Sequence, residues 1–242
     1  MNSLPLTNKV AVIAGASGGI GSAIARCFAL QGASLVLISR RKAVLNNLLK
    51  EITREGAIAK AYCFDLADPA AVKSSMQAII KEFGRVDILV NAAGVGSVGR
   101  DILTTSLKDF QTTLDVNLKT VFLMAQAVLP GMMRRRDGVI INIGSISGKN
   151  GKANQAVYCA SKFALVGFSE ALLEEAKWHN IRVSIICPDI VRTANRVKKI
   201  SSKSKIEDLI DPQDIAQAAL LCARDSKFAT FKEIVVRTRR PL

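Results

Sequence analysis

The sequence predicts a single doubly wound α/β domain, in which a parallel sheet carries helices on both faces. Three observations support this fold class. Short apolar, β-branched segments alternate with amphipathic helical segments along the whole chain. A glycine-rich turn joins the first apolar segment to the first helical one. The 242 residues, 49% of them apolar, can bury one large core, and no linker or low-complexity stretch divides them.

The apolar segments have the length and composition of strands. We expect strands at Val10–Ala14, Ser34–Ser39, Ile58–Phe64, Ile88–Asn91, Val139–Ile143, Val183–Cys187 and Glu233–Arg237. We expect helices between them at Ile20–Gln31, Ala43–Arg54, Pro69–Phe83, Phe110–Arg135, Gln155–His179 and Pro212–Arg224. Because a helix returns the chain to the same end of the sheet after each strand, the strands should be parallel.

The two longest predicted helices, 110–135 and 155–179, are apolar over more than one face, as Val121, Phe122 and Phe163 illustrate. Packing on the sheet accounts for one face of each helix. The other face is expected to meet a second copy of the chain, which predicts a homodimer or a homotetramer.

Composition limits the class of protein further. The five cysteines are scattered without a CxxC pair, which favours buried free thiols over disulfides and predicts no metal site. No apolar run approaches the roughly 18 residues that a membrane span needs. The first strand begins by about Lys9, which leaves too few residues for a signal peptide, so a cytoplasmic location is expected.

The net charge of +14 is large for a chain of this length. Its basic residues are spread over predicted helix surfaces, and aromatic residues make up only 5% of the chain. Without a stacking platform, specific nucleic-acid binding is not expected, and a basic surface or an acidic partner is the favoured interpretation.

The first predicted strand ends in the turn Gly15-Ala16-Ser17-Gly18-Gly19-Ile20-Gly21, which opens the first helix. We assign Gly15 to the tight turn, Gly19 to close approach of a pyrophosphate, and Gly21 to packing of the helix on the strand. The helix N-terminus would face the phosphate charge, and Ser17 and Ile20 are expected to contact the cofactor. A purely structural turn is the alternative.

The second predicted strand ends at Ser39, and Arg40 and Arg41 follow it. A carboxylate at this point holds the ribose 2′-hydroxyl of NAD, whereas guanidinium groups suit the 2′-phosphate of NADP. We therefore expect NADP(H), held mainly by Arg40 and less by Arg41. A solvated basic loop is the alternative.

Tyr158 and Lys162 open a long predicted helix with the spacing i, i+4, which places both on one helix face. A free tyrosine titrates at about pH 10, and an adjacent ammonium group favours the phenolate. Ser145 follows the predicted strand 139–143, at the edge of a parallel sheet where ligands bind. Its hydroxyl could hold a substrate carbonyl oxygen. A tyrosine and a lysine at this spacing also occur together by chance.

In order and in spacing, these motifs resemble the short-chain dehydrogenase/reductases, and among them the 3-oxoacyl-(acyl-carrier-protein) reductases and their relatives. The residues that carry the resemblance are Gly15, Gly19, Gly21, the run Asn91-Ala92-Ala93-Gly94, Asn117, Ser145, Tyr158 and Lys162. It extends from about Lys9 to Arg224. The resemblance implies a Rossmann fold with seven parallel strands in the order 3-2-1-4-5-6-7, and an NADPH-dependent carbonyl reductase.

The resemblance also implies roles for the matched residues. Tyr158 would be the acid–base group and Ser145 would position the carbonyl. Lys162 would bind the nicotinamide ribose and assist Tyr158, and Asn117 would hold a water of the proton relay. The further cofactor contacts that it implies are Asp65 and Leu66 at the adenine, Asn91, Ala92 and Gly94 at its ribose, and Pro188 and Thr193 at the nicotinamide.

The segment 189–211 covers the substrate in this family, and here it is short and basic. Its cationic residues are Arg196, Lys198, Lys199, Lys203 and Lys205. The segment is either a solvated loop or a landing site for an acidic carrier or an anionic substrate.

The substrate itself stays open. A 3-oxoacyl thioester is the first expectation, and a small ketone, a sugar, a steroid-like compound or a hydroxy acid are alternatives. A catalytically silent NADP-binding interaction protein is the alternative of a different class. The complete set of Asn117, Ser145, Tyr158 and Lys162 argues against it.

Overall fold

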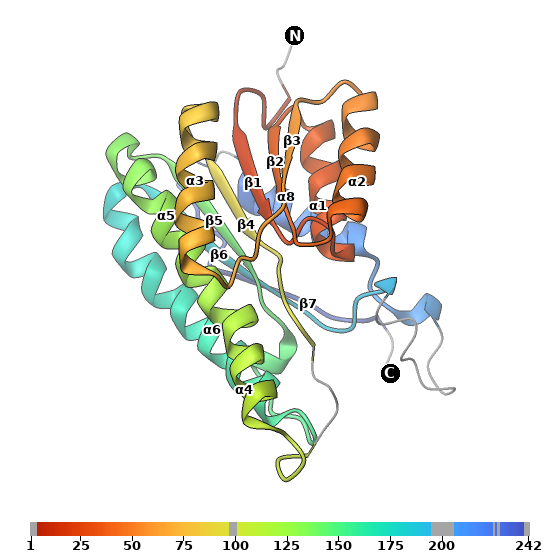
Figure 1. Ribbon diagram of the computed structural model, residues 1–242. Helices are drawn as coiled ribbons and strands as arrows, with labels where there is room; N and C mark the ends of the chain where they lie inside the picture. The colour runs from red at the N-terminus through yellow and green to blue at the C-terminus, as the bar shows by residue number, and fades with distance from the viewer. Residues whose placement is uncertain (1–3, 97–100, 195–205, 225, 227, 240–242) are drawn as a thin grey trace.

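Seven strands form one sheet and run parallel to one another (Figure 1). The structure is a computed structural model and describes residues 4–96, 101–194, 206–224, 226 and 228–239. The strands are β1 (Val10–Ala14), β2 (Ser34–Ile38), β3 (Ala59–Tyr62), β4 (Ile88–Asn91), β5 (Gly138–Ile143), β6 (Ile181–Pro188) and β7 (Glu233–Val236). Their order, β3-β2-β1-β4-β5-β6-β7, confirms the predicted fold class, and only the strand ends differ from the prediction.

Helices return the chain between the strands. They are α1 (Gly19–Leu30), α2 (Lys42–Arg54), α3 (Pro69–Phe83), α4 (Leu107–Leu114), α5 (Thr120–Arg135), α6 (Ala156–Ala176) and α8 (Pro212–Ala223). The side chains of Asp68 and Asp211 cap α3 and α8, and a proline follows each of them at the helix start.

The predicted helix 110–135 is longer than expected and is interrupted. It begins at Leu107, because the Ser106 hydroxyl accepts a hydrogen bond from the Asp109 amide over 3.1 Å. Between α4 and α5 lies a π-helical turn, Asp115–Lys119, which contains Asn117. Hydrophobic periodicity does not reveal such a turn, and π turns often mark functional sites.

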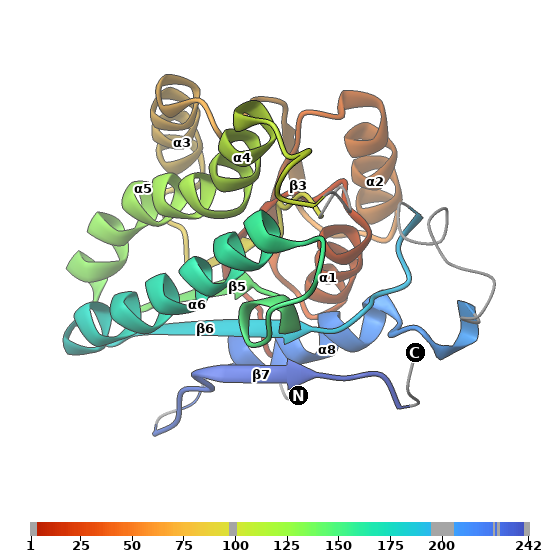
Figure 2. The ribbon, with the colours of Figure 1, turned by 90° about the horizontal axis from the view of Figure 1, so that it is seen from below.

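The helices form a layer on each face of the sheet (Figure 2). On one face, Phe28 of α1 and Ala219 of α8 share a core with Ile13 of β1. On the other face, Met124 of α5 packs in a core with Val12 of β1. Neighbouring residues of β1 therefore point into different cores, as expected for a central strand that is buried on both sides.

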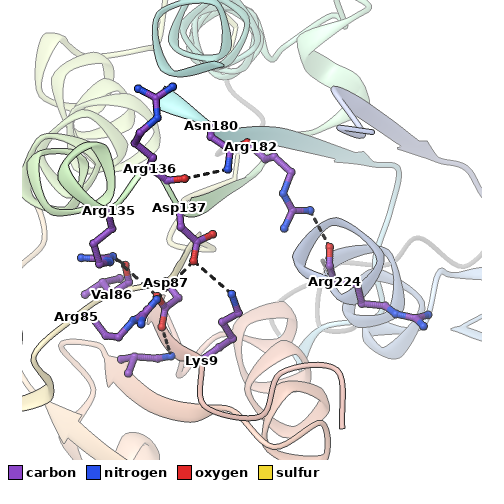
Figure 3. Close-up of polar contacts among 11 residues, drawn as sticks. Lys9, Arg85, Val86, Asp87, Arg135, Arg136, Asp137, Asn180, Arg182 and Arg224 are labelled. Carbon is purple, nitrogen blue, oxygen red and sulfur yellow. Dashed lines mark hydrogen bonds and ion pairs between the residues drawn. The ribbon is translucent and has the colours of Figure 1, made fainter. Parts of the chain in front are cut away.

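A buried carboxylate ties the start of β1 to the turn before β4 and to the end of α5 (Figure 3). Asp87 is 2% exposed and accepts hydrogen bonds from the Val10 amide (2.8 Å) and from Arg85 Nε (2.6 Å). Arg135 Nη2 lies 3.9 Å from the same carboxylate and donates to the Val86 carbonyl over 2.6 Å. These contacts fix the amino edge of the sheet, where the strands begin.

One prediction from composition needs correction. Cys63 is exposed, whereas the other four cysteines are buried as predicted. Two helical stretches, Leu107–Arg135 and Ala156–His179, are long and apolar enough to cross a membrane by length and composition alone, a test that the core helix of a soluble protein also passes. Both contain core helices of the sheet, because α5 packs on β4 and β5 and α6 packs on β6.

Candidate active site

The glycine-rich turn is closely packed at three of its glycines, where an added Cβ would meet neighbouring protein atoms. Gly15 has φ +88°, and a Cβ there would lie 2.5 Å from the Ala93 nitrogen. A Cβ at Gly21 would overlap the Gly15 carbonyl oxygen, so α1 packs closely on the turn. A Cβ at Gly19 would lie 2.8 Å from Thr193 Cγ2, so Thr193 lies directly over the helix start.

The N-terminus of α1 is suited to an anion. Its N-cap is Gly18, and no side chain of the described residues caps the helix. The first amide groups of α1 therefore keep their donors for another partner, and the helix dipole favours a negative charge there. Ser17 and Ile20 lie within this turn, as the assignment of a pyrophosphate site requires.

The two arginines after β2 lie in different places. Arg41 donates from Nε to Ser17 Oγ over 3.1 Å and also bonds through Nη2 to the Ser17 carbonyl, so it lies against the glycine-rich turn. Ser39 Oγ contacts Ser17 Oγ and accepts from the Arg41 amide over 3.1 Å. Arg40 instead pairs with Asp65 over 3.4 Å. The structure therefore gives Arg41 the closer relation to the phosphate turn, whereas the sequence favoured Arg40.

The other residues that are expected to contact the adenosine half of the cofactor lie at the carboxyl edge of the sheet. Asp65 follows β3 and accepts from the Ala67 amide over 3.0 Å, and Leu66 is buried. The side chain of Asn91 is buried and donates to Asn142 Oδ1 over 2.9 Å. Ala92, which follows β4, donates its amide to the Ala14 carbonyl over 2.8 Å.

Lys162 is buried beside Tyr158. Its ammonium nitrogen lies 6.0 Å from the centre of the Tyr158 ring and donates to the Ile143 carbonyl over 3.0 Å. The side chain is 5% exposed, and this burial lowers the pKa of Lys162 from 10.5 to about 8. A Cβ at Gly94 would lie 3.8 Å from the same nitrogen, which places Gly94 at this site too.

Ser145 stands at the end of β5, next to the strand that ends at Pro188. It is 9% exposed, and its hydroxyl accepts a hydrogen bond from the Ser147 amide over 3.1 Å. Tyr158 lies half-buried in the first turn of α6. The structure therefore brings Ser145, Tyr158 and Lys162 to the carboxyl edge of the sheet, as the sequence predicted.

Asn117 is fully buried and is held on three sides. Its Oδ1 accepts from the Val95 amide over 2.9 Å, and its Nδ2 donates to the Val95 carbonyl over 3.1 Å. Nδ2 also donates to Ser161 Oγ over 3.0 Å. Sequence reasoning missed Ser161 and Val95. A serine within the apolar helix that carries Tyr158 and Lys162 was the available signal for Ser161.

The structure describes only part of the segment that is expected to contact the nicotinamide. Beyond Pro188, the Asp189 amide donates to the Val236 carbonyl over 2.8 Å, and Arg192 pairs with Asp211. The basic residues expected to recognise an anion, Arg196 to Lys205, lie outside the described residues. Within the described ranges there is no group of three or more His, Cys, Asp or Glu side chains that could hold a metal ion.

Comparisons with known proteins agree with this geometry. The family model described as "short chain dehydrogenase" matches residues 9–204. The 3-oxoacyl-[acyl-carrier-protein] reductase FabG of Thermotoga maritima is 32% identical over 230 residues, which cover 91% of this chain and 92% of the relative.

Two solved structures are similar over nearly their whole length. A metagenomic short-chain oxidoreductase in complex with NADP is 34% identical, with a TM-score of 0.86 over 99% of this chain and 100% of that one. A 7α-hydroxysteroid dehydrogenase in complex with NADH and 7-oxo glycochenodeoxycholic acid is 30% identical, with a TM-score of 0.90 over 98% and 96%.

Proposed function

This chain belongs to the short-chain dehydrogenase family, and we propose that it is an NADP(H)-dependent carbonyl reductase in which Tyr158 donates the proton. Family membership makes it an oxidoreductase that acts on an alcohol or a carbonyl group with a nicotinamide cofactor. The observation that carries the proposal is the buried Lys162 ammonium group, 6.0 Å from the centre of the Tyr158 ring.

The residues of the site can hold and move a proton at the Tyr158 hydroxyl. When Tyr158 gives its proton to a carbonyl oxygen, the Lys162 cation stabilises the phenolate that remains. Ser145 would hold the same oxygen through its hydroxyl. Both amide hydrogens of Asn117 are already engaged, so a relay water there would use the free side of Oδ1 or the backbone.

A dinucleotide would fit the glycine-rich turn, because the turn carries no side chain at Gly15, Gly18, Gly19 or Gly21 that could block the approach of a phosphate. The nicotinamide supplies the hydride when it is bound. The uncapped start of α1 would hold the pyrophosphate, and Thr193 would lie on the nicotinamide side of that turn.

We infer a preference for NADP(H) over NAD(H) from the basic end of the site. The guanidinium group of Arg41 lies against Ser17, and that of Arg40 is 63% exposed, so either can meet a 2′-phosphate. The NADP complex of the metagenomic relative supports this preference. The NADH complex of the 7α-hydroxysteroid dehydrogenase shows that the fold accommodates both cofactors, so the choice depends on these side chains.

A 3-oxoacyl thioester is the first substrate class to test, and the FabG relative supports it. The 7-oxo compound bound to the steroid dehydrogenase favours a broader panel that includes cyclic ketones. A silent NADP-binding protein would have no need of a buried ammonium group beside Tyr158, because burying that charge costs stability.

We also propose that the chain is a homo-oligomer. A surface groove between α4, α5 and α6 is lined mainly by apolar atoms. Its lining includes Leu114, Leu118, Phe122, Ala164 and Phe168. The equivalent groove of a second copy could cover this surface through a two-fold axis, as the sequence predicted. Light scattering at micromolar concentration tests this assembly, and a monomer would contradict it.

The proposed function is tested by oxidation of NADPH with a panel of 3-oxoacyl thioesters, cyclic ketones and keto sugars. We expect turnover of at least one carbonyl by the natural protein. The Tyr158→Phe variant should bind NADPH normally and lose nearly all turnover. Turnover that survives Tyr158→Phe would assign the proton to another group.

A further inference from the structure

The amino edge of the sheet, opposite the candidate active site, gathers cationic side chains from several turns (Figure 3). They come from the residue before β1, the turn before β4, the end of α5 and the residue after it, the segment after α6, the start of β6 and the residue after α8. The cations are Lys9, Arg85, Arg134, Arg135, Arg136, Lys177, Arg182 and Arg224. The acidic side chains that pair with them in the described part of the chain are Asp87, Asp137 and Glu174. These eight cations outnumber the three acids that pair with them, and Glu55, Glu82, Glu175 and Glu233 are further carboxylates at this edge.

Helix ends explain why cations lie here. The Arg136 guanidinium donates to the Trp178 carbonyl over 3.0 Å, just beyond α6. The Arg182 guanidinium donates to the Arg224 carbonyl over 2.7 Å, just beyond α8. Carbonyl groups at helix C-termini attract cations, and such contacts stabilise the turns.

Contacts with helix ends do not explain why this edge also exposes apolar side chains. Each of these residues stands at the end of a helix or in the segment that leads into a strand, so it lies at the amino edge. They are Leu4, Leu30, Ile58, Trp178 and Phe228. Trp178 is 74% exposed and Phe228 is 90% exposed, and the Lys177 ammonium group lies 5.6 Å from the centre of the Trp178 ring.

We propose that this basic amino edge docks on an anionic membrane surface. Cations attract the negative headgroups, and isolated tryptophan, phenylalanine and leucine side chains enter the boundary below them. A nucleic acid would use the cations and Trp178 but would leave Leu4, Leu30 and Ile58 exposed to water. A membrane is fluid, so it can accept apolar side chains that come from separate turns and do not form a groove.

Docking in this way leaves catalysis undisturbed. Ser145, Tyr158 and Lys162 lie at the carboxyl edge, so a docked molecule keeps its substrate mouth away from the lipid. The proposal therefore stands or fails independently of the proposed reaction.

Trp178 is the only tryptophan of the chain, so its fluorescence reports on this edge directly. The full protein is mixed with phosphatidylcholine vesicles that either contain or lack phosphatidylserine. We expect a blue shift only with phosphatidylserine, quenching by lipids brominated on their acyl chains, and release at high salt. An unchanged emission spectrum with both vesicles, together with no co-sedimentation, would overturn the proposal.

Paired variants separate this edge from the overall charge of the protein. Arg134→Gln/Arg224→Gln removes two exposed cations of the amino edge, and Lys73→Gln/Lys108→Gln removes two exposed cations near the starts of α3 and α4. The first pair should weaken vesicle binding by roughly tenfold or more, and the second by far less.

Three outcomes would contradict the proposal here. The two pairs could weaken binding equally, which would indicate net charge alone. The first pair could leave binding unchanged. A single-stranded oligonucleotide could shift the Trp178 emission where vesicles do not, which would assign the edge to nucleic acid. Circular dichroism and NADPH binding confirm that each variant is folded.

Discussion

The side-chain amide of Asn117 donates a hydrogen bond to the Ser161 hydroxyl over 3.0 Å, and that hydroxyl donates to the Tyr158 backbone carbonyl over 2.7 Å. One serine thus joins the π turn to the first turn of the helix that carries Tyr158 and Lys162. Eight residues along the same helix, Ser169 repeats the pattern, since it accepts from Asn142 Nδ2 over 2.9 Å. The helix α6 is therefore held at two points by buried contacts between an asparagine side chain and a serine hydroxyl.

Ser161→Ala should lower kcat by about tenfold with a smaller effect on KM, because Asn117 loses a buried partner and the start of α6 loses its hold on the π turn. The unfolding free energy should fall by about 1–2 kcal/mol. Ser169→Ala is the matched control, since it removes a similar contact further along α6. We expect it to reduce stability by a similar amount and to leave kcat nearly unchanged. Equal loss of kcat in both variants would make Ser161 a merely structural residue.

Arg41→Asp should weaken NADPH binding by about 2 kcal/mol or more, because a carboxylate replaces the guanidinium that lies against Ser17. Arg40→Asp should weaken NADPH binding less, since the Arg40 guanidinium already forms an ion pair with Asp65. Fluorescence titration with NADPH and NADH gives both dissociation constants for each variant. A larger effect at Arg40 would restore the order that the sequence favoured. Equal affinity of the natural protein for both cofactors would remove the basis for an NADP preference.

Lys162→Met should abolish most activity and yet stabilise the fold. Burial lowers the pKa of Lys162 to about 8, below its usual 10.5, so the charged form opposes folding. This cost is fully present below pH 8 and fades as the pH rises towards 10.5. The variant should therefore unfold at a higher temperature at pH 7, with a gain of about 1–3 kcal/mol. The gain in unfolding free energy should be smaller at about pH 10, because most of the buried lysine is then uncharged.

Chemical denaturation of Lys162→Met at the two pH values provides the measurement. Lys152→Met, at an exposed position before α6, serves as the control and should change stability little at either pH. A destabilised Lys162→Met protein at pH 7 would show that the packing and hydrogen bond of Lys162 outweigh the cost of burying its charge.

Asp87→Asn should destabilise the protein by about 2–4 kcal/mol, because the buried carboxylate holds Arg85 and faces Arg135 (Figure 3). Asp137→Asn tests the neighbouring carboxylate, which is 41% exposed and pairs with Lys9 over 3.4 Å. Its cost should stay below about 1 kcal/mol, as for other exposed ion pairs. Thermal unfolding compares the two variants, and a larger effect at Asp137 would contradict the assigned roles.

The sequence alone determined the parallel sheet and the parts of the site that follow from local chemistry. A chain that alternates apolar strands with amphipathic helices is compatible with few folds other than a doubly wound sheet. The order of the strands was implied by the family resemblance. Roles could be assigned to Gly15, Gly19 and Gly21 because glycines at this spacing after a first strand are typical of a nucleotide-binding turn. The spacing of Tyr158 and Lys162 placed both on one helix face without reference to the rest of the chain.

Tertiary structure decided whatever depended on contacts between distant segments. Arg40 and Arg41 are neighbours in sequence, yet one faces Asp65 and the other faces Ser17. Periodicity could not show the π turn at Asn117 or its link to Ser161, 44 residues away. Hydrophobic pattern indicates which face of a helix or strand is buried, because burial follows from transfer out of water. The partner of a buried polar group is fixed only when the packed helices bring a donor and an acceptor together.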